Sequence, residues 1–348
     1  MELIAYSLLY LIMIFFIFFP GIIKEKYFFI FWLIIVITLS FIIRSTIGEG
    51  AVQTDIEGYV ISMQEDTVEH IYFLREFIFW FGSRYLFNIL EDATSVFVVL
   101  DIIFYLFLYK GISLNKEIFT SNIKTENIRY IFFGILLFFP FVLGMHNVYR
   151  QVMATAIFMT TIGYFSNSEF KKSFLTFLLA FFVHNSIVIF IGSIFVFSKK
   201  NIYKIFAFVS TISGLIGSSI VISLSSGWFT RATAELSIGN NIAYLYLGIL
   251  LAIITIVIFF ERFNKEKKFN PLIYFFIILF MIYSYSAFTL TSQAAERVVL
   301  YALGLMFPFL AFYCEDRFKP KILIRLIFSH LSIAPLFILY NTTINLQL

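Results

Sequence analysis

Apolar residues follow one another in long blocks along most of the chain, and short clusters of charged residues separate these blocks. A helix of about 20 apolar residues, rising about 1.5 Å per residue, crosses the roughly 30 Å hydrocarbon core of a bilayer. The pattern therefore predicts an all-α, polytopic bundle of transmembrane helices that forms a single integral membrane domain over residues 1–348. We expect about ten full spans, near residues 3–23, 27–43, 85–109, 128–144, 148–165, 202–224, 242–260, 271–290, 298–314 and 322–340.

A polar stretch interrupts this pattern after the second predicted span. Residues 44–84 hold charged and polar side chains, which predicts an outer loop. The stretch ends in an aromatic segment, residues 71–81, whose composition is typical of an amphipathic helix lying along the membrane interface.

The distribution of basic residues orients the spans, because Lys and Arg on short loops are retained on the cytoplasmic side. They gather near residues 24–26, 110–129, 171–172, 199–204, 262–268 and 317–325. A full crossing through residues 173–198 would place the later clusters outside. We therefore predict that this stretch is a re-entrant or broken helical hairpin, with His184, Asn185 and Ser186 at its tip. All 15 lysines and four of the ten arginines then lie inside.

The basic residues left on the outer side are all arginines: Arg44, Arg75, Arg84, Arg150, Arg231 and Arg297. Two interpretations stay open. Guanidinium groups bind phosphate oxygens through two parallel hydrogen bonds, which favours an anionic lipid-phosphate ligand. Alternatively, arginine side chains reach the headgroups from the ends of spans and have no further role. We expect Arg44 to tolerate replacement by lysine.

Composition excludes several classes of protein. Hydrophobic residues make up 61% of the chain and charged residues only 13%, which is too little charge to cover a soluble globular surface. The single cysteine, Cys314, excludes an internal disulfide and a cysteine-rich metal site. The four histidines are scattered, and no nucleotide-binding glycine loop or nucleophile elbow occurs. We expect no metal, no cofactor and no nucleic-acid partner.

Polar residues on the predicted outer side supply the candidates for chemistry. Asp55 and Tyr59 are four residues apart, so a helix would place carboxylate and phenol on one face, where both reach one sugar. The charged residues from Glu65 to Glu69 are typical of a solvated loop. Glu296 and Arg297 are adjacent, which is poor geometry for an ion pair, so each is expected to find another partner.

Four further polar residues lie in apolar surroundings. Arg150 and Gln151 begin a predicted span with almost no loop before it, and a polar pair so close to hydrocarbon needs partners. His184 lies within an apolar stretch, where it is either a base, donor or ligand, or a structural residue bonded to a backbone carbonyl. Asp101 lies within a predicted span and is either functional, neutral, or paired with an interior arginine for helix packing.

Taken in order along the chain, four short motifs resemble the EpsG family of Wzy-like bacterial polysaccharide polymerases. They are Asp55-x3-Tyr59, Arg150-Gln151-x2-Ala154, His184-x-Ser186 and Arg297-x3-Tyr301. The similarity extends over nearly the whole chain in hydropathy. Two positions depart from the family pattern: Val183 stands where an aromatic residue is usual, and Ile187 where a small residue is common. These departures concern the packing of the hairpin.

The resemblance implies a metal-independent glycosyltransferase of the lipid-donor type in the bacterial cytoplasmic membrane, with its active site facing outward. It would polymerise glycan repeat units carried by undecaprenyl pyrophosphate into exopolysaccharide, capsule or O-antigen. Membrane lipid, a flippase and chain-length regulators are the other partners that it implies. Arg150 and Arg297 would stabilise the leaving pyrophosphate, and Asp55 or His184 would be the general base. The candidates for substrate binding are Tyr59, Gln151, Asn185, Arg231, Glu296 and Tyr301.

Two other functions stay open. A flippase for lipid-linked sugars would use the same arginines to hold phosphate without chemistry, and a ligase would attach the glycan to another acceptor. Transporters usually contain two related halves with corresponding broken helices. Only residues 173–198 are predicted to be broken, which favours the enzyme.

Overall fold

The computed structural model describes residues 2–45, 47, 55–64, 76–119, 124–198, 200–224, 240–262, 271–290 and 292–339. Within these residues every regular element is a helix and no strand occurs, which confirms the predicted all-α class. Contacts between residues group the chain into two compact units. The first comprises Met1–Asn185 together with Phe307–Leu348, and the second comprises Ser186–Met306.

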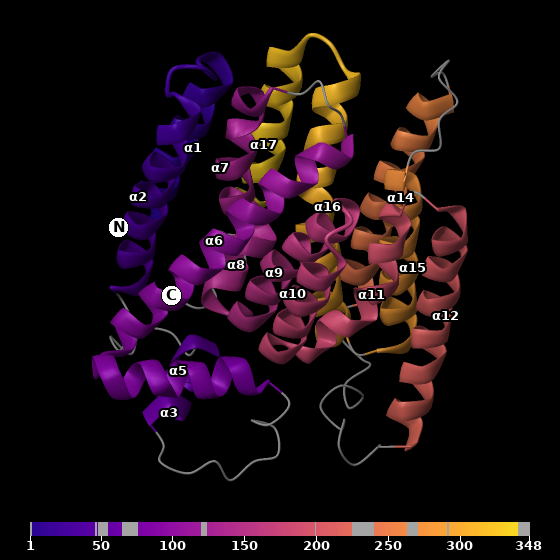
Figure 1. The fold of residues 1–348 in the computed structure, drawn as a ribbon, viewed down its shortest axis with the longest axis horizontal. Helices are drawn as coiled ribbons and strands as arrows, with labels where there is room; N and C mark the ends of the chain where they lie inside the picture. Colours follow the sequence, from indigo (N-terminus) through magenta and orange to yellow (C-terminus); the bar gives the residue numbers. More distant parts are fainter. Residues whose placement is uncertain are drawn as a thin grey trace. The chain divides into compact units, whose positions relative to one another are not determined.

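The helices of the first unit come mainly from the N-terminal half of the chain (Figure 1). They are α1 (Glu2–Phe18), α2 (Glu25–Arg44), α3 (Asp55–Gln64), α5 (Phe77–Leu90), α6 (Ala93–Phe119), η1 (Thr125–Ile128), α7 (Arg129–Leu137), α8 (Phe139–His146), α9 (Tyr149–Ser166), α10 (Phe170–Val183) and α17 (Lys321–Leu339).

The second unit contains α11 (Ile191–Ile194), η3 (Phe195–Phe197), α12 (Asn201–Leu224), α14 (Asn240–Arg262) and α15 (Pro271–Thr289). Two elements cross the boundary between the units. The short helix η2 (Asn185–Phe190) begins at the last residue of the first unit, and α16 (Ser292–Arg317) starts in the second unit and ends in the first.

Among the described residues, five helices are long and apolar enough to cross a membrane: Glu25–Arg44, Ala93–Lys116, Tyr244–Arg262, Pro271–Thr289 and Ala294–Arg317. A bent pair, Thr125–Leu137 with Phe139–His146, makes up to six. The expectation of about ten full spans is therefore not confirmed. The apolar segment Leu3–Phe18 also forms a helix, but it is shorter than the 18 residues of a candidate span.

The predicted span at residues 85–109 is wrong in its boundaries, because the helix is interrupted between α5 and α6. Glu91 adopts a left-handed conformation with φ of 53° and ends α5. The carboxylate of Asp92 then accepts hydrogen bonds from the backbone N–H groups of Thr94 and Ser95, and so caps the first turn of α6. In Figure 1, α5 consequently lies across the direction in which α1 and α2 run.

The predicted span at residues 128–144 is also interrupted. Phe138 has an extended backbone between α7 and α8, and the two helices differ in direction by 45°. Pro140 lies in the first turn of α8. Proline has no N–H to donate to the preceding turn and its ring clashes there, so a continuous helix is unfavourable at this point.

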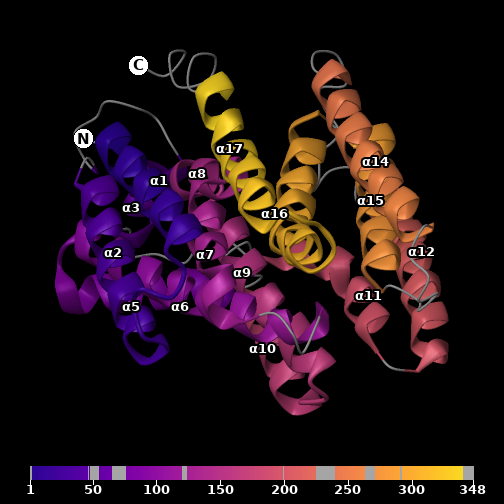
Figure 2. The same ribbon diagram turned by 90° about the horizontal axis from the view of Figure 1, so that it is seen from above.

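Helix α9 lies at the centre of the first unit, with α6 and α10 packed along it (Figures 1 and 2). Every residue from Gln151 to Gly163 is buried, as expected for a helix that is mostly apolar all round. The corner between α8 and α9 is tight. A Cβ atom added at Gly144 would lie 2.1 Å from a methyl group of Val152, so only glycine allows the two helices to approach so closely.

The close approach at Gly144 predicts that a single methyl group destabilises the fold. Gly144→Ala should reduce the free energy of unfolding by about 1–3 kcal/mol, since overpacking forces the neighbouring helix to shift. The melting temperature of the purified protein in detergent measures this effect. Gly214→Ala is the matched control, because nothing lies within 4 Å of a Cβ atom there. Equal melting temperatures for both variants would contradict the packing argument.

Candidate functional site

The buried carboxylate of Glu76 is the centre of a cluster of polar and charged side chains in the first unit. The residue immediately precedes α5 and is only 1% exposed. One carboxylate oxygen accepts a hydrogen bond from Nη1 of Arg150. The other oxygen bonds Nδ1 of His184 and accepts the backbone N–H of Asn185 at 3.3 Å. We call Glu76, Arg150 and His184 the Glu76 cluster.

Arg150 lies in the first turn of α9, which begins at Tyr149. Its Nε donates to the hydroxyl of Tyr59 at 3.3 Å. Its guanidinium carbon lies 5.1 Å from the ring centroid of Tyr59 and 4.8 Å from that of Trp80. These aromatic faces are favourable surroundings for a planar cation. The guanidinium is thus held by Tyr59 of α3 and by Glu76 and Trp80 at the start of α5.

His184 lies where α10 ends. Its backbone is extended, with φ of −154° and ψ of 111°, and the 3₁₀ helix η2 begins at the next residue. The predicted interruption of the helical stretch near residues 184–186 is therefore present. Whether the stretch returns to the cytoplasmic side remains a prediction. Because an ionised carboxylate only accepts hydrogen bonds, Nδ1 of His184 carries the proton that it donates to Glu76, which leaves Nε2 as the basic nitrogen.

The partners of Glu76 also determine its charge. Burial alone would raise the pKa of this carboxyl group. The hydrogen bond and electrostatic interaction with His184 and the charge of Arg150 outweigh burial, with a smaller contribution from the N–H of Asn185. The pKa of Glu76 therefore lies below its ordinary value of 4.5, and the carboxylate is ionised at neutral pH.

Four of the residues singled out from the sequence come together in this site: Tyr59, Arg150, His184 and Asn185. Glu76 was missed, although it connects three of them. In the sequence, Glu76 does not differ from the neighbouring carboxylates of the predicted solvated loop. The one feature that distinguishes it is its position directly before an aromatic helix. When that helix packs against the protein, the carboxylate before it becomes buried as well.

The remaining candidates lie elsewhere in the described chain. Asp55 is exposed at the first residue of α3, whereas Tyr59 on the same helix is buried. Gln151 is buried in α9. Glu296 is half-buried and Arg297 is exposed near the start of α16.

In the second unit, Ser186 and Tyr301 share a hydrogen bond of 2.9 Å between their hydroxyl oxygens. The ring of Tyr301 also packs against Phe190, with 5.3 Å between centroids. Arg231 and the loop residues 65–70 lie outside the described residues. In the described part of the chain, no group of three His, Cys, Asp or Glu side chains is placed to hold a metal ion.

The lowered pKa of Glu76 predicts how stability depends on pH. The folded protein keeps this carboxylate ionised more readily than the unfolded chain does. Its stabilising contribution is therefore complete above about pH 4.5 and is lost as the pH falls through the lower folded pKa. Melting temperatures measured from neutral to acidic pH should fall more for the wild type than for Glu76→Gln, which has no carboxyl group to titrate.

Glu169→Gln is the matched control for this pH series, since Glu169 makes an exposed ion pair with Lys172. Exposed pairs contribute about 0–1 kcal/mol, so this variant should follow the wild-type pH dependence. Identical pH dependence for the wild type and Glu76→Gln would show that the Glu76 cluster does not stabilise the fold.

Comparison with known proteins identifies the family. The model of the EpsG family matches residues 29–347, a range that includes all three members of the Glu76 cluster and the pair formed by Ser186 and Tyr301. No curated protein and no solved structure gives a significant match. Since the family model matches most of the sequence, the chain belongs to the EpsG family.

Proposed function

We propose that the chain polymerises glycan repeat units carried by undecaprenyl pyrophosphate, at the outer face of the bacterial cytoplasmic membrane. Membership of the EpsG family suggests polysaccharide polymerisation, and the candidate membrane-spanning helices suit a lipid-linked substrate. The observation that carries the proposal is the Glu76 cluster, because it joins an oriented imidazole to a partly buried guanidinium through one carboxylate. Those are the groups that such a transfer requires.

The reaction breaks the bond between the anomeric carbon of the donor glycan and its pyrophosphate oxygen. The lipid pyrophosphate leaves with the electron pair, and a hydroxyl oxygen of the acceptor repeat unit bonds to the anomeric carbon. The acceptor hydroxyl must also lose its proton. We assign this proton to Nε2 of His184, since the hydrogen bond from Nδ1 to Glu76 orients the ring and stabilises the imidazolium that forms.

We assign Arg150 to the stabilisation of the leaving pyrophosphate. Its guanidinium remains charged in every relevant pH range and offers N–H donors to phosphate oxygens. With a neutral imidazole, the charges of Glu76 and Arg150 cancel. When His184 takes the proton, the Glu76 cluster becomes positive while negative charge develops on the departing pyrophosphate. Proton transfer and leaving-group stabilisation thus favour each other in this arrangement.

Residues of the second unit are assigned to the sugars and the lipid. The hydroxyl groups of Ser186 and Tyr301 form a polar pair, and Ser186 follows the proposed base closely in the sequence. Arg297 precedes Tyr301 by about one turn of α16, and Glu296 adjoins it. Hydroxyl, carboxylate and guanidinium groups are the usual hydrogen-bonding partners of glycans and phosphates. We propose that these residues orient the substrates and take no proton.

His184 variants test the assignment of the base. Purified protein in lipid should convert a lipid-linked repeat unit into a ladder of longer products without nucleotide sugar or added metal. His184→Gln keeps a hydrogen-bonding group but accepts no proton at neutral pH, so the rate of ladder formation should fall by about 10²–10⁴ while the lipid-linked unit still binds. A near-normal rate of ladder formation by His184→Gln would show that His184 is not the general base. Asp55 would then be the first candidate for that role.

The wild type could instead form no ladder and move the labelled lipid across the membrane of a proteoliposome. That result would indicate a flippase rather than a polymerase. Transfer of a single repeat unit to a different acceptor, without a ladder, would indicate a ligase. Both outcomes would contradict the proposed function.

Arg150→Lys tests the role of the guanidinium. A lysine keeps the positive charge but cannot donate two parallel hydrogen bonds, so the rate of ladder formation should fall by about 10²–10³, by analogy with the loss of one oriented donor at a developing charge. Arg317→Lys is the control, because Arg317 is 35% exposed and pairs only loosely with Asp316 at 3.4 Å. Full activity of Arg150→Lys at wild-type abundance would rule out a phosphate contact that needs a guanidinium.

A further inference from the structure

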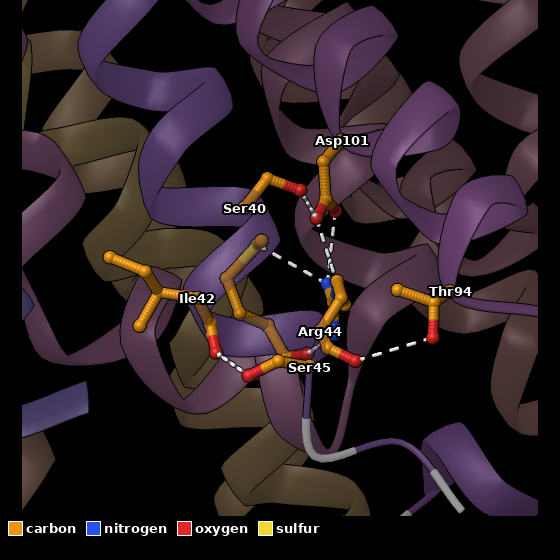
Figure 3. A network of polar contacts seen from close by, with 7 residues as sticks. Ser40, Ile42, Arg44, Ser45, Thr94 and Asp101 are labelled. Atoms are coloured by element: carbon orange, nitrogen blue, oxygen red, sulfur yellow. Dashed lines mark hydrogen bonds and ion pairs between the residues drawn. The ribbon is translucent and has the colours of Figure 1, made fainter. Parts of the chain in front are cut away.

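A second buried ion pair lies in the first unit, between Arg44 and Asp101. Arg44 is the last residue of α2 and Asp101 lies within α6, and both side chains are almost fully buried. Nε and Nη2 of Arg44 donate to the two carboxylate oxygens of Asp101, at 2.9 Å each. Ser40 donates a further hydrogen bond of 2.5 Å to the same carboxylate (Figure 3). Of the alternatives for Asp101, pairing with an interior arginine is thus the one observed.

The remaining contacts of Arg44 lead to the corner between α8 and α9. Its Nη1 donates to the backbone carbonyl of Met145 at 2.7 Å, near the end of α8. Its guanidinium carbon lies 5.0 Å from the ring centroid of Tyr149, the first residue of α9. One guanidinium therefore contacts the residue before the corner and the residue after it. The next residue along α9 is Arg150.

We propose that Arg44 is a positioning residue for Arg150. It holds Met145 and Tyr149 in fixed places relative to α2 and α6, and so determines the direction in which α9 begins. That direction in turn determines where the Arg150 side chain lies relative to Glu76. This inference rests on the proposed function for its catalytic consequence. Its structural basis is independent of that function, because it depends only on the contacts across the corner.

The geometry requires an arginine in particular. Its planar fork bonds both oxygens of Asp101 and the carbonyl of Met145, and its central carbon lies 5.0 Å from the centroid of the Tyr149 ring. A lysine ammonium is a single point on a flexible chain and cannot satisfy these partners together. The expectation from the sequence that Arg44→Lys is tolerated is therefore replaced by the opposite one.

A double-mutant cycle tests the inference with the full-length protein in lipid nanodiscs. Arg44→Lys should lower the rate of ladder formation per folded molecule by about 10- to 100-fold, since a misplacement of about 1 Å costs up to about 10²-fold. If Arg44 acts through Arg150, adding Arg44→Lys to Arg150→Lys should have almost no further effect. The same fold-change in both backgrounds would overturn the inference.

A second variant covers the case in which Arg44→Lys does not fold. Tyr149→Leu removes the ring next to the guanidinium and keeps both members of the pair between Arg44 and Asp101. It should show the same lack of additivity with Arg150→Lys. Additive effects for Tyr149→Leu would count against the inference in the same way.

The chain offers a matched control in the pair between Glu315 and Arg325. This pair is also buried and has two hydrogen bonds, of 3.0 and 2.6 Å, between α16 and α17. The guanidinium of Arg325 lies over the ring of Tyr130, at the start of α7. Met145 lies at the opposite end of the bent pair formed by α7 and α8. Arg325→Lys should lower stability but leave the rate per folded molecule unchanged. A loss of rate equal to that of Arg44→Lys would indicate a general effect of broken ion pairs.

Binding measurements separate this inference from the proposed function. The probe is undecaprenyl pyrophosphate, whose dissociation constant is measured for the same variants. A wild type that binds the probe but makes no ladder would refute the polymerase, and the cycle could still be evaluated on dissociation constants. Arg44→Lys should then weaken binding by about 10-fold in the wild-type background and not in Arg150→Lys. Equal weakening in both backgrounds would overturn the positioning role whether or not a ladder forms.

Discussion

The structure depends on the burial of one carboxylate, because an ionised Glu76 that is 1% exposed is stable only with matched cations and hydrogen-bond donors. Arg150 supplies the cation from the start of α9, and His184 supplies a ring N–H from the end of α10. These two residues are far apart in the sequence and come from different helices. The requirement of the carboxylate for partners therefore ties three segments into one site, and removal of Glu76 takes away the group that joins Arg150 to His184.

The helices of the first unit present these groups at their ends rather than along their sides. Arg150 is in the first turn of α9, His184 follows α10, and Glu76 precedes α5. Side chains at helix ends reach one another without interrupting the packing of the apolar surfaces between the helices. Gly144 and the contacts of Arg44 lie at the corner that precedes α9, so features that pack the helices lie next to Arg150.

Composition and spacing were sufficient to predict the helical class, the presence of helices apolar enough to cross a membrane, and four residues that the structure brings together around Glu76. Tyr59, Arg150, His184 and Asn185 stood out because polar groups in apolar surroundings need partners. The partner itself, Glu76, could not be identified, because pairing across 74 and 108 residues depends on tertiary packing.

Helix boundaries failed where local geometry overrides hydropathy. Glu91, with its left-handed backbone, ends one helix within a predicted span. Pro140 lies in the first turn of a new helix within another predicted span. Nuclear magnetic resonance of the ring nitrogens tests the central claim most directly, since the chain has only 4 histidines and His184→Gln assigns the signal. The account predicts a proton on Nδ1 of His184, in a strong hydrogen bond that disappears in Glu76→Gln. A proton on Nε2, with a spectrum that Glu76→Gln leaves unchanged, would contradict it.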